Sequence, residues 1–258
     1  MAPPKFEKET RPNRLEFWNR KAKTFPRYSP GENTYEAGVL QLAKDNGAVF
    51  AGARVLDVGA GTGLYTVRIA QEAQEVVAVD FSSEMLAILE EDAAKLNLTN
   101  IKTHNIGWLE FPLNGEFNVV YCSMCPAMGQ PGGLEKVLTI PKAQVVYLGW
   151  NGLLRSNVLT GLYETYKVTP KTFDSAGPTR AFLDENKVKY TTAPVEGTWR
   201  VRFSLELLTD SVVQNLSDYG VEPDLDQITS YLKTFQEPDG QCVEVTDYKI
   251  QMILWRNS

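Results

Sequence analysis

Apolar residues in the first 150 positions alternate between short continuous runs and helical spacing. Val55, Leu56 and Val58 form one run, and residues 75–80 form another. Continuous short runs are typical of strands that are buried on both faces. The stretches between them place apolar residues three or four positions apart, as amphipathic helices do. This alternation predicts an α/β fold with a doubly wound, mostly parallel sheet.

The pattern assigns a type to most of the chain. We expect strands at residues 54–59, 75–80, 100–105, 117–122 and 144–150, with helices at 62–73 and 82–97. Beyond them we expect helices at 152–166 and 177–187, a strand at 190–201, helices at 204–216 and 224–235, and a strand at 242–255. Ligands of such sheets bind beyond the carboxyl ends of the strands. Those ends are Gly59, Asp80, Asn105, Ser123 and Gly149–Trp150.

The first 48 residues predict a helical cap preceded by a loose polar arm, Met1–Arg11. A helix from Asn13 would carry one apolar stripe, formed by Leu15, Trp18, Ala22 and Phe25. Prolines and a glycine at positions 26, 30 and 31 break it, and a second helix is expected at 33–46.

The first predicted strand runs into a glycine-rich turn, Asp57-Val-Gly-Ala-Gly-Thr-Gly63. Glycine at every second position lets the backbone turn sharply and approach a ligand, because no Cβ stands in the way. The helix that follows would offer unpaired N–H groups to that ligand. A dinucleotide fingerprint would require a third glycine at position 64, which is Leu64. A NAD(P)-type site and a glycine turn in an unrelated protein are therefore the disfavoured alternatives.

The form Asp-x-Gly-x-Gly-x-Gly, followed by a second apolar strand that ends at Asp80, resembles motif I of the class I S-adenosylmethionine-dependent methyltransferases. The resemblance implies a Rossmann-like, seven-stranded sheet whose last two strands form an antiparallel edge. It also implies one domain, 1–258, with a cap (1–48), a core (49–203 and 241–258) and a helical insertion (204–240). It is specific at Asp57–Gly63 and Asp80, and weaker outside residues 50–150.

The same resemblance implies S-adenosyl-L-methionine as the cofactor, with Asp80 accepting hydrogen bonds from the ribose hydroxyls. An acid that the superfamily often has near Gly107 is absent, so Asn105 would offer its carbonyl and Trp108 could stack on adenine. A surface asparagine and a core tryptophan are the alternatives. The expected cofactor-binding residues are Tyr28, Asp57, Gly59, Ala60, Gly61, Thr62, Gly63, Asp80, Phe81, Met85, Asn105, Ile106, Gly107, Trp108 and Cys122.

The stretch Tyr121–Gly129 would face the reactive methyl group. It lacks the Asn/Asp-Pro-Pro-Tyr motif shared by methyltransferases that act on bases or glutamine, which argues against an exocyclic-nitrogen acceptor. We name no general base, and Tyr28, His104 and the Cys122–Cys125 loop are the only candidates. Residues that could contact the acceptor are Trp18, Tyr28, Ser123, Met124, Cys125 and Arg200.

Each of these side chains has a second interpretation. Trp18 could be a core anchor. Cys122 and Cys125 have CxxC spacing, which is half a zinc site at best, so we expect no metal. The pair could serve a soft acceptor such as a thiol or metalloid, or simply line a pocket. Arg200 and Arg202 share a strand face and could grip an anionic group, or lie solvated at a sheet edge.

Composition narrows the class of protein further. The 258 residues include three cysteines and no apolar run near the roughly 20 residues of a membrane span, so we expect a cytoplasmic protein without membrane contact. Residues 1–30 hold eight basic and three acidic side chains, a charge of +5, which leaves −11 for the rest of a chain whose net charge is −6. The acidic body disfavours nucleic acid, and the basic segment could attract an anionic ligand.

The predicted function is methyl transfer from S-adenosylmethionine to a nucleophile on a small molecule. One alternative is a protein that binds the cofactor without turnover. Another is a methyltransferase acting on protein or RNA, which the negative net charge disfavours. The pattern leaves the oligomeric state open.

Overall fold

A computed structural model describes residues 11–258 of the chain, with side chains described from Arg14 onward. Residues 1–10 of the predicted arm Met1–Arg11, and the charges they carry, lie outside the described residues, and Arg11 begins a helix. The chain divides into two compact units. The first comprises the described residues up to Gly149, Ser175–Ala193 and Met252–Ser258, and the second comprises Trp150–Asp174 and Pro194–Gln251.

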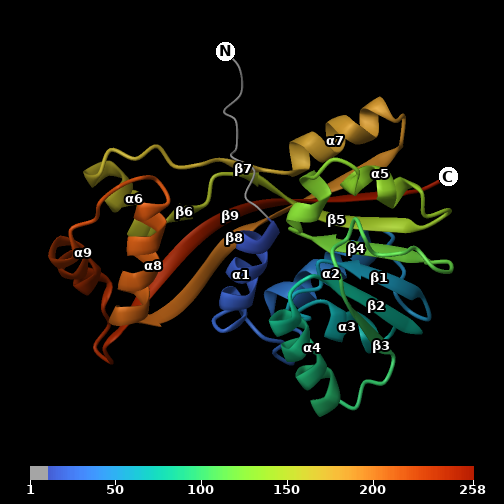
Figure 1. The fold of residues 1–258 in the computed structure, drawn as a ribbon, viewed down its shortest axis with the longest axis horizontal. Helices are drawn as coiled ribbons and strands as arrows, with labels where there is room; N and C mark the ends of the chain where they lie inside the picture. Colours follow the sequence, from blue (N-terminus) through green and yellow to red (C-terminus); the bar gives the residue numbers. More distant parts are fainter. Residues whose placement is uncertain (1–10) are drawn as a thin grey trace. The chain divides into compact units, whose positions relative to one another are not determined.

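The first unit contains the predicted parallel sheet (Figure 1). Its strands follow the order β3-β2-β1-β4-β5, continued by β9 and β6. The neighbours β3–β2, β2–β1, β1–β4 and β4–β5 are all parallel. The strand bounds are β1 Arg54–Val58, β2 Glu75–Asp80, β3 Ile101–Asn105, β4 Val119–Ser123, β5 Gln144–Gly152 and β9 Gln241–Arg256.

Helices cover both faces of this sheet because both faces of its strands are apolar. On one face Val137 of α5 and Leu183 of α7 pack into the main core cluster. On the other face Leu86 and Leu89 of α4 pack against Ala78. The helices of this unit are α1 Arg11–Ala22, α2 Tyr35–Asp45, α3 Thr66–Ala70, α4 Ser83–Lys95, the 3₁₀ turn η1 Pro126–Gly129, α5 Gly133–Leu138 and α7 Ala176–Glu185.

Two details correct the sequence prediction. The helix expected at 62–73 is only α3, Thr66–Ala70, because Gly59, Gly61 and Gly63 have positive φ angles of 75°, 55° and 81° and hold residues up to that point in a turn. Over residues 11–258 the sheet has nine strands rather than seven. Two of them, β6 Arg155–Ser156 and β7 Phe173–Asp174, are two residues long and too short to produce a periodic pattern.

The predicted antiparallel edge is present: β6 pairs antiparallel with β9, and β7 pairs antiparallel with the end of β5. The long strand β8, Tyr190–Ser204, pairs with β9. The boundary between the two units falls within β5, β8 and β9.

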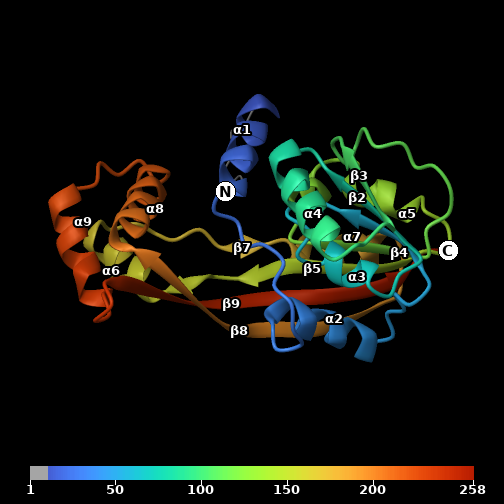
Figure 2. The ribbon, with the colours of Figure 1, turned by 90° about the horizontal axis from the view of Figure 1, so that it is seen from below.

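The second unit has its own hydrophobic core. Helices α6 Asn157–Thr165, α8 Leu205–Ser217 and α9 Leu225–Leu232, with the 3₁₀ turn η2 Lys233–Phe235, lie together in Figure 2. The insertion expected at 204–240 therefore shares its core with α6, and the second unit is larger than that insertion. The buried residues of this core are Val158, Leu162, Leu208, Val212, Leu216, Ile228, Leu232 and Cys242. Within residues 11–258, no helix combines the length and apolarity needed to cross a bilayer.

Candidate active site

The glycine turn after β1 is shaped by close packing at two of its three glycines. A Cβ on Gly59 would lie 2.5 Å from the Cys125 sulfur, and one on Gly63 would lie 2.6 Å from Cγ of Leu89. A Cβ on Gly61 would meet nothing within 4 Å. The turn is thus fixed at both ends, and its middle residue presents an open backbone surface to a ligand.

The carboxylate of Asp80 lies against this open part of the turn. Its Oδ2 accepts the Gly61 N–H at 2.9 Å, and its Oδ1 accepts the Ser82 N–H at 2.9 Å. Burial raises the pKa of Asp80, and the two backbone hydrogen bonds oppose that rise. Each carboxylate oxygen has a further lone pair, so Asp80 can accept hydrogen bonds from a bound ligand as well.

Asp57 lies beneath the turn on β1 and is 2% exposed. Its Oδ2 accepts the Thr66 hydroxyl at 2.5 Å, which ties β1 to the start of α3. Burial raises the pKa of Asp57 to about 7, while the Thr66 hydrogen bond lowers it and the charge of Asp80 adds to the rise.

Residues 19–31, which we call the N-terminal strap, are bonded to the glycine turn and to the end of β2. The Thr62 hydroxyl donates to the Pro26 carbonyl at 2.7 Å. The Ser82 hydroxyl donates to Asn19 Oδ1 at 2.7 Å. Thr62 and Asp80 were expected at the cofactor, and the strap reaches the immediate neighbourhood of both.

An ion pair holds the strap to α4. Arg27 donates to both carboxylate oxygens of Asp92, at 2.6 and 3.2 Å, and to Glu91 at 2.8 Å. Burial alone would raise the pKa of Asp92, but hydrogen bonds from Arg27 and Lys95 lower it below its usual value. A charged Asp92 is therefore favoured in the folded protein.

The cap aromatics predicted to contact ligand are engaged with the protein. The Tyr28 hydroxyl accepts from Gln71 at 3.1 Å, and its ring lies 5.1 Å from the Arg68 guanidinium. Trp18 packs edge-on against Phe17 and Phe25 at centroid distances of 5.4 and 6.2 Å. The position of Trp18 favours the core-anchor interpretation.

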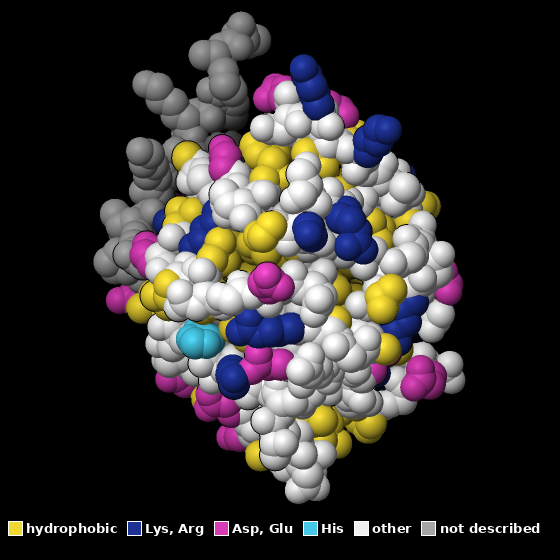
Figure 3. All heavy atoms as spheres, turned by 90° about the vertical axis from the view of Figure 1, so that its right-hand side faces the viewer, with side chains coloured by type: hydrophobic (Ala, Val, Ile, Leu, Met, Phe, Trp, Pro, Cys, Tyr) yellow, Lys and Arg dark blue, Asp and Glu magenta, His cyan; other side chains and the backbone are white. Residues whose placement is uncertain are grey.

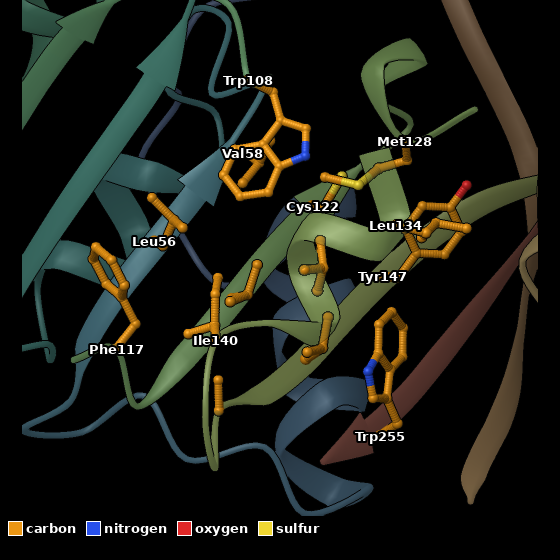
Figure 4. Packing of buried hydrophobic residues seen from close by; sticks show 14 of the residues in the cluster. Leu56, Val58, Trp108, Phe117, Cys122, Met128, Leu134, Ile140, Tyr147 and Trp255 are labelled. Atoms are coloured by element: carbon orange, nitrogen blue, oxygen red, sulfur yellow. The ribbon is translucent and has the colours of Figure 1, made fainter. Parts of the chain in front are cut away.

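On the adenine side, the structure separates Asn105 from Trp108. Asn105 is exposed and its amide donates to the Asp80 carbonyl at 3.3 Å, which leaves the side-chain oxygen able to accept. Trp108 is 4% exposed, and its indole N–H donates to the Gly133 carbonyl at 2.9 Å. Figure 4 shows the ring packed in the core beside Val58, Cys122 and Met128, so the core interpretation fits Trp108.

The remaining predicted cofactor residues lie at the same edge of the sheet. Ala60, Gly61, Phe81, Ile106 and Gly107 are half-buried, whereas Met85 on α4 is buried. Cys122 is also buried, and burial raises the pKa of its thiol well above the usual value. Cys122 is thus a neutral thiol in the core. Its side chain lies on the opposite face of the sheet from Tyr121, which pairs with Asp57 of β1.

The loop after β4 contains a residue in a rare conformation. Met124 has φ 51°, in the left-handed region that non-glycine residues seldom adopt. This turn brings half-buried Cys125 against Gly59, while Ser123 ends β4 with its hydroxyl buried. The predicted acceptor residues Ser123, Met124 and Cys125 therefore adjoin the glycine turn.

Sequence reasoning missed a group of hydroxyls beside Ser123. Tyr65 and Tyr121 bury their hydroxyls on the α3 side of the sheet, and Tyr35 lies close enough to lower the pKa of Tyr65. A tyrosine inside the otherwise apolar strand 119–122 was the only available signal.

Two other candidates, Arg200 and His104, contact other side chains of the protein. Arg200 and Arg202 lie in the second unit and both bind Glu237, at 3.1 and 2.6 Å, which fits the solvated-strand interpretation. His104 is exposed on β3, with its ring edge-on to Phe111 at 5.2 Å.

Comparison with known proteins agrees with the motif. Residues 55–139 match the family model described as a methyltransferase domain. The magnesium-protoporphyrin O-methyltransferase of Rhodobacter capsulatus is 34% identical over 90 residues, which are 35% of this chain and 38% of that protein. The glycine/sarcosine N-methyltransferase of Parasynechococcus marenigrum (strain WH8102) is 34% identical over 85 residues, 32% of this chain and 28% of that protein. The match thus spans about a third of the length of these curated relatives.

Solved structures share the fold over most of the chain. Magnesium protoporphyrin IX methyltransferase from Synechocystis PCC 6803 with bound SAH has a TM-score of 0.54 at 12% identity and covers 94% of both chains. The YcgJ protein from Bacillus subtilis has a TM-score of 0.55 at 17% identity and covers 85% of this chain and 98% of that one. Residues 55–139, which include the glycine motif, are thus similar to a methyltransferase domain, and the solved structures share the fold of the chain.

Proposed function

We propose that this protein transfers the methyl group of S-adenosyl-L-methionine to a nucleophile on a small molecule. One observation carries the proposal: the Asp80 carboxylate is held at 2.9 Å by the Gly61 N–H, directly beside an open glycine backbone. That arrangement offers charged acceptors for ribose hydroxyls and an unobstructed path for the rest of the ligand.

The residues present fit this cofactor. Asp80 would bind the ribose, the backbone of Gly59–Gly63 would cradle the methionine end, and the side-chain oxygen of exposed Asn105 would accept from the adenine amino group. When bound, the cofactor supplies a methyl group already activated by a positive sulfur. The relatives named for porphyrin and glycine methylation support the same cofactor and a small-molecule acceptor.

The protein's own contribution is chiefly alignment and exclusion of water. Positioning two reactants can supply about 7–11 kcal/mol of the barrier. The strap is suited to this task because it is bonded to Thr62 of the glycine turn and, through Asn19, to Ser82 beyond β2. Burial keeps the Cys122 thiol and the Tyr65 and Tyr121 phenols protonated, so none of these groups would remove a proton from the acceptor, and the two phenols would orient it.

The surface charge supports a small molecule over RNA. On the face shown in Figure 3, basic and acidic side chains are interspersed and form no continuous basic region. Arg200 and Arg202, the one basic pair suggested for an anionic acceptor, already bind Glu237. A cytoplasmic location is part of the proposal and agrees with three free cysteines, as a reducing compartment maintains them.

Calorimetry with the purified full chain tests the proposal. S-adenosylmethionine and S-adenosylhomocysteine should bind, and NAD⁺ should not. Radiolabelled methyl transfer to a panel of amines, alcohols and carboxylates should then identify the acceptor. Binding without transfer to any compound would support the non-catalytic alternative, and binding of NAD⁺ alone would refute the assignment.

A further inference from the structure

Three buried hydroxyl groups of the first unit have no hydrogen-bond partner among the residues that the structure describes. They belong to Tyr65, Tyr121 and Ser123. Tyr121 is fully buried on β4, and Tyr65, which is 8% exposed, directly precedes α3. Buried polar groups in folded proteins are almost always hydrogen-bonded, so three exceptions at one place call for a partner that the described residues do not supply.

The three hydroxyls lie on one face of the sheet. Tyr121 and Ser123 alternate along β4 and therefore point the same way, and the Tyr65 and Tyr121 rings are 5.0 Å apart. The hydroxyls are near enough to shift the pKa of Tyr65, although none reaches another with hydrogen-bonding geometry. A small group inserted among them could contact more than one.

The cluster adjoins the proposed active site through Ser123. Ser123 is only half-buried as a residue, and so is Tyr35. Ser123 also precedes Met124, whose φ of 51° turns the chain so that Cys125 touches Gly59. Ser123 therefore connects the cluster to the junction between the glycine turn and the loop after β4.

The charges that act on these phenols are negative. Burial raises the pKa of both tyrosines. Glu36 raises the pKa of Tyr65 further, and Asp57 does the same at Tyr121. A carboxylate or phosphate placed here would be desolvated in a region of low dielectric, near the carboxylate of Glu36.

We propose that the hydroxyls of Tyr65, Tyr121 and Ser123 bind an uncharged hydrogen-bonding group of the acceptor, such as a carboxamide, carbonyl or alcohol, and select against a carboxylate. The inference rests on the proposed function, because it places the acceptor at this junction. A hydroxyl both donates and accepts, so a carboxamide can satisfy several of them through its oxygen and its N–H groups.

Benzamide and benzoate test this proposal, because they are alike in shape and differ in charge. Their binding is measured by calorimetry with the full chain, with and without saturating S-adenosylhomocysteine. Benzamide should bind at least about tenfold more tightly than benzoate. Tyr121→Phe, which deletes one oxygen, should weaken benzamide binding by about 5–10-fold and leave S-adenosylhomocysteine binding unchanged.

A matched variant separates binding from folding. Tyr147 is equally buried on β5, on the opposite face of the sheet, and its hydroxyl donates to the Ser175 carbonyl at 3.4 Å. Tyr147→Phe should lower the melting temperature without changing benzamide binding. Tyr121→Phe should not lower it, because no hydrogen bond is lost.

Equal binding of benzamide and benzoate, or no binding of either, would overturn the inference. So would unchanged benzamide binding in Tyr121→Phe, which is the result expected if only trapped water contacts the hydroxyls. If S-adenosylhomocysteine binds the wild type but the probes are not discriminated, only this inference fails. If S-adenosylhomocysteine does not bind at all, the proposed function fails with it.

Discussion

Asp57→Asn should remove a large pH dependence from the stability of the protein. The wild-type carboxyl is buried, and this burial raises its pKa from 3.8 to about 7. Between these values the folded protein keeps a proton that the unfolded chain has lost, so the free energy of unfolding must fall as the pH rises through this range. Asparagine cannot ionise, so the variant lacks this fall in the free energy of unfolding.

The size of the effect follows from the two pKa values. Each pH unit between them corresponds to about 1.4 kcal/mol, so complete ionisation of Asp57 costs the fold about 4 kcal/mol. Most of that loss, roughly 3 kcal/mol, falls between pH 5 and pH 8. Asparagine keeps an oxygen to accept the Thr66 hydroxyl, so the local hydrogen bond survives the substitution.

Urea unfolding at pH 5 and pH 8 measures this difference in both proteins. The test compares how far the free energy of unfolding falls between pH 5 and pH 8 in the wild type and in Asp57→Asn. Any effect of the amide on stability that does not depend on pH cancels in this difference. Equal m-values are required for the comparison. If the free energy of unfolding falls equally in the two proteins between pH 5 and pH 8, the assignment of a raised pKa to Asp57 is refuted.

Asp92→Asn provides a control of opposite sign. Hydrogen bonds from Arg27 and Lys95 lower the pKa of Asp92 despite its burial. Its stabilising contribution is therefore present above the unfolded pKa and is lost as the pH falls through the lower, folded value. Asp92→Asn should change the acid side of the stability curve and leave the change between pH 5 and pH 8 as in the wild type.

Three further substitutions test the site. Gly63→Ala should lower the free energy of unfolding by about 2–4 kcal/mol, because the new Cβ would sit at a φ of 81° and 2.6 Å from a buried leucine. Gly61→Ala, at φ 55° in open space, should lower it by about 1 kcal/mol. Equal losses of stability in urea unfolding would contradict this difference. Asp80→Ala should weaken S-adenosylmethionine binding by about 1.5–3 kcal/mol, and an unchanged calorimetric Kd would count against a ribose contact. Arg27→Ala should raise the pKa of Asp92 in a carboxyl NMR titration, because its hydrogen-bond donor is gone, and an unmoved pKa would show that the strap is not held there.

Most of the first unit could be predicted from the sequence because its information is local. Strands β1, β2, β3 and β5 begin within one residue of the positions expected from apolar runs, since a strand buried on both faces produces such a run directly. The short α3 could not be predicted, because helical spacing continues through residues 62–73, and this spacing does not reveal the positive φ of 81° at Gly63.

The candidate site divides in the same way. Asp80 and the glycine turn are recognisable because their geometry is made by neighbours in sequence and by backbone groups. The environment of Trp108 is not, because its burial depends on a hydrogen bond to Gly133, 25 residues away. The hydroxyl cluster was invisible for the same reason: its residues come from different elements, and only the fold shows that they lack partners.

Features that destabilise the folded protein are concentrated at one place, and their clustering is independent support for the site. A desolvated Asp57, a left-handed Met124 and the partnerless hydroxyl of Tyr121 all lie near the carboxyl ends of two adjacent strands, β1 and β4. Each feature destabilises the protein when considered alone. Their convergence beside the glycine turn would be improbable if that region only had to fold. It is expected if the region must hold a ligand whose atoms supply the missing interactions.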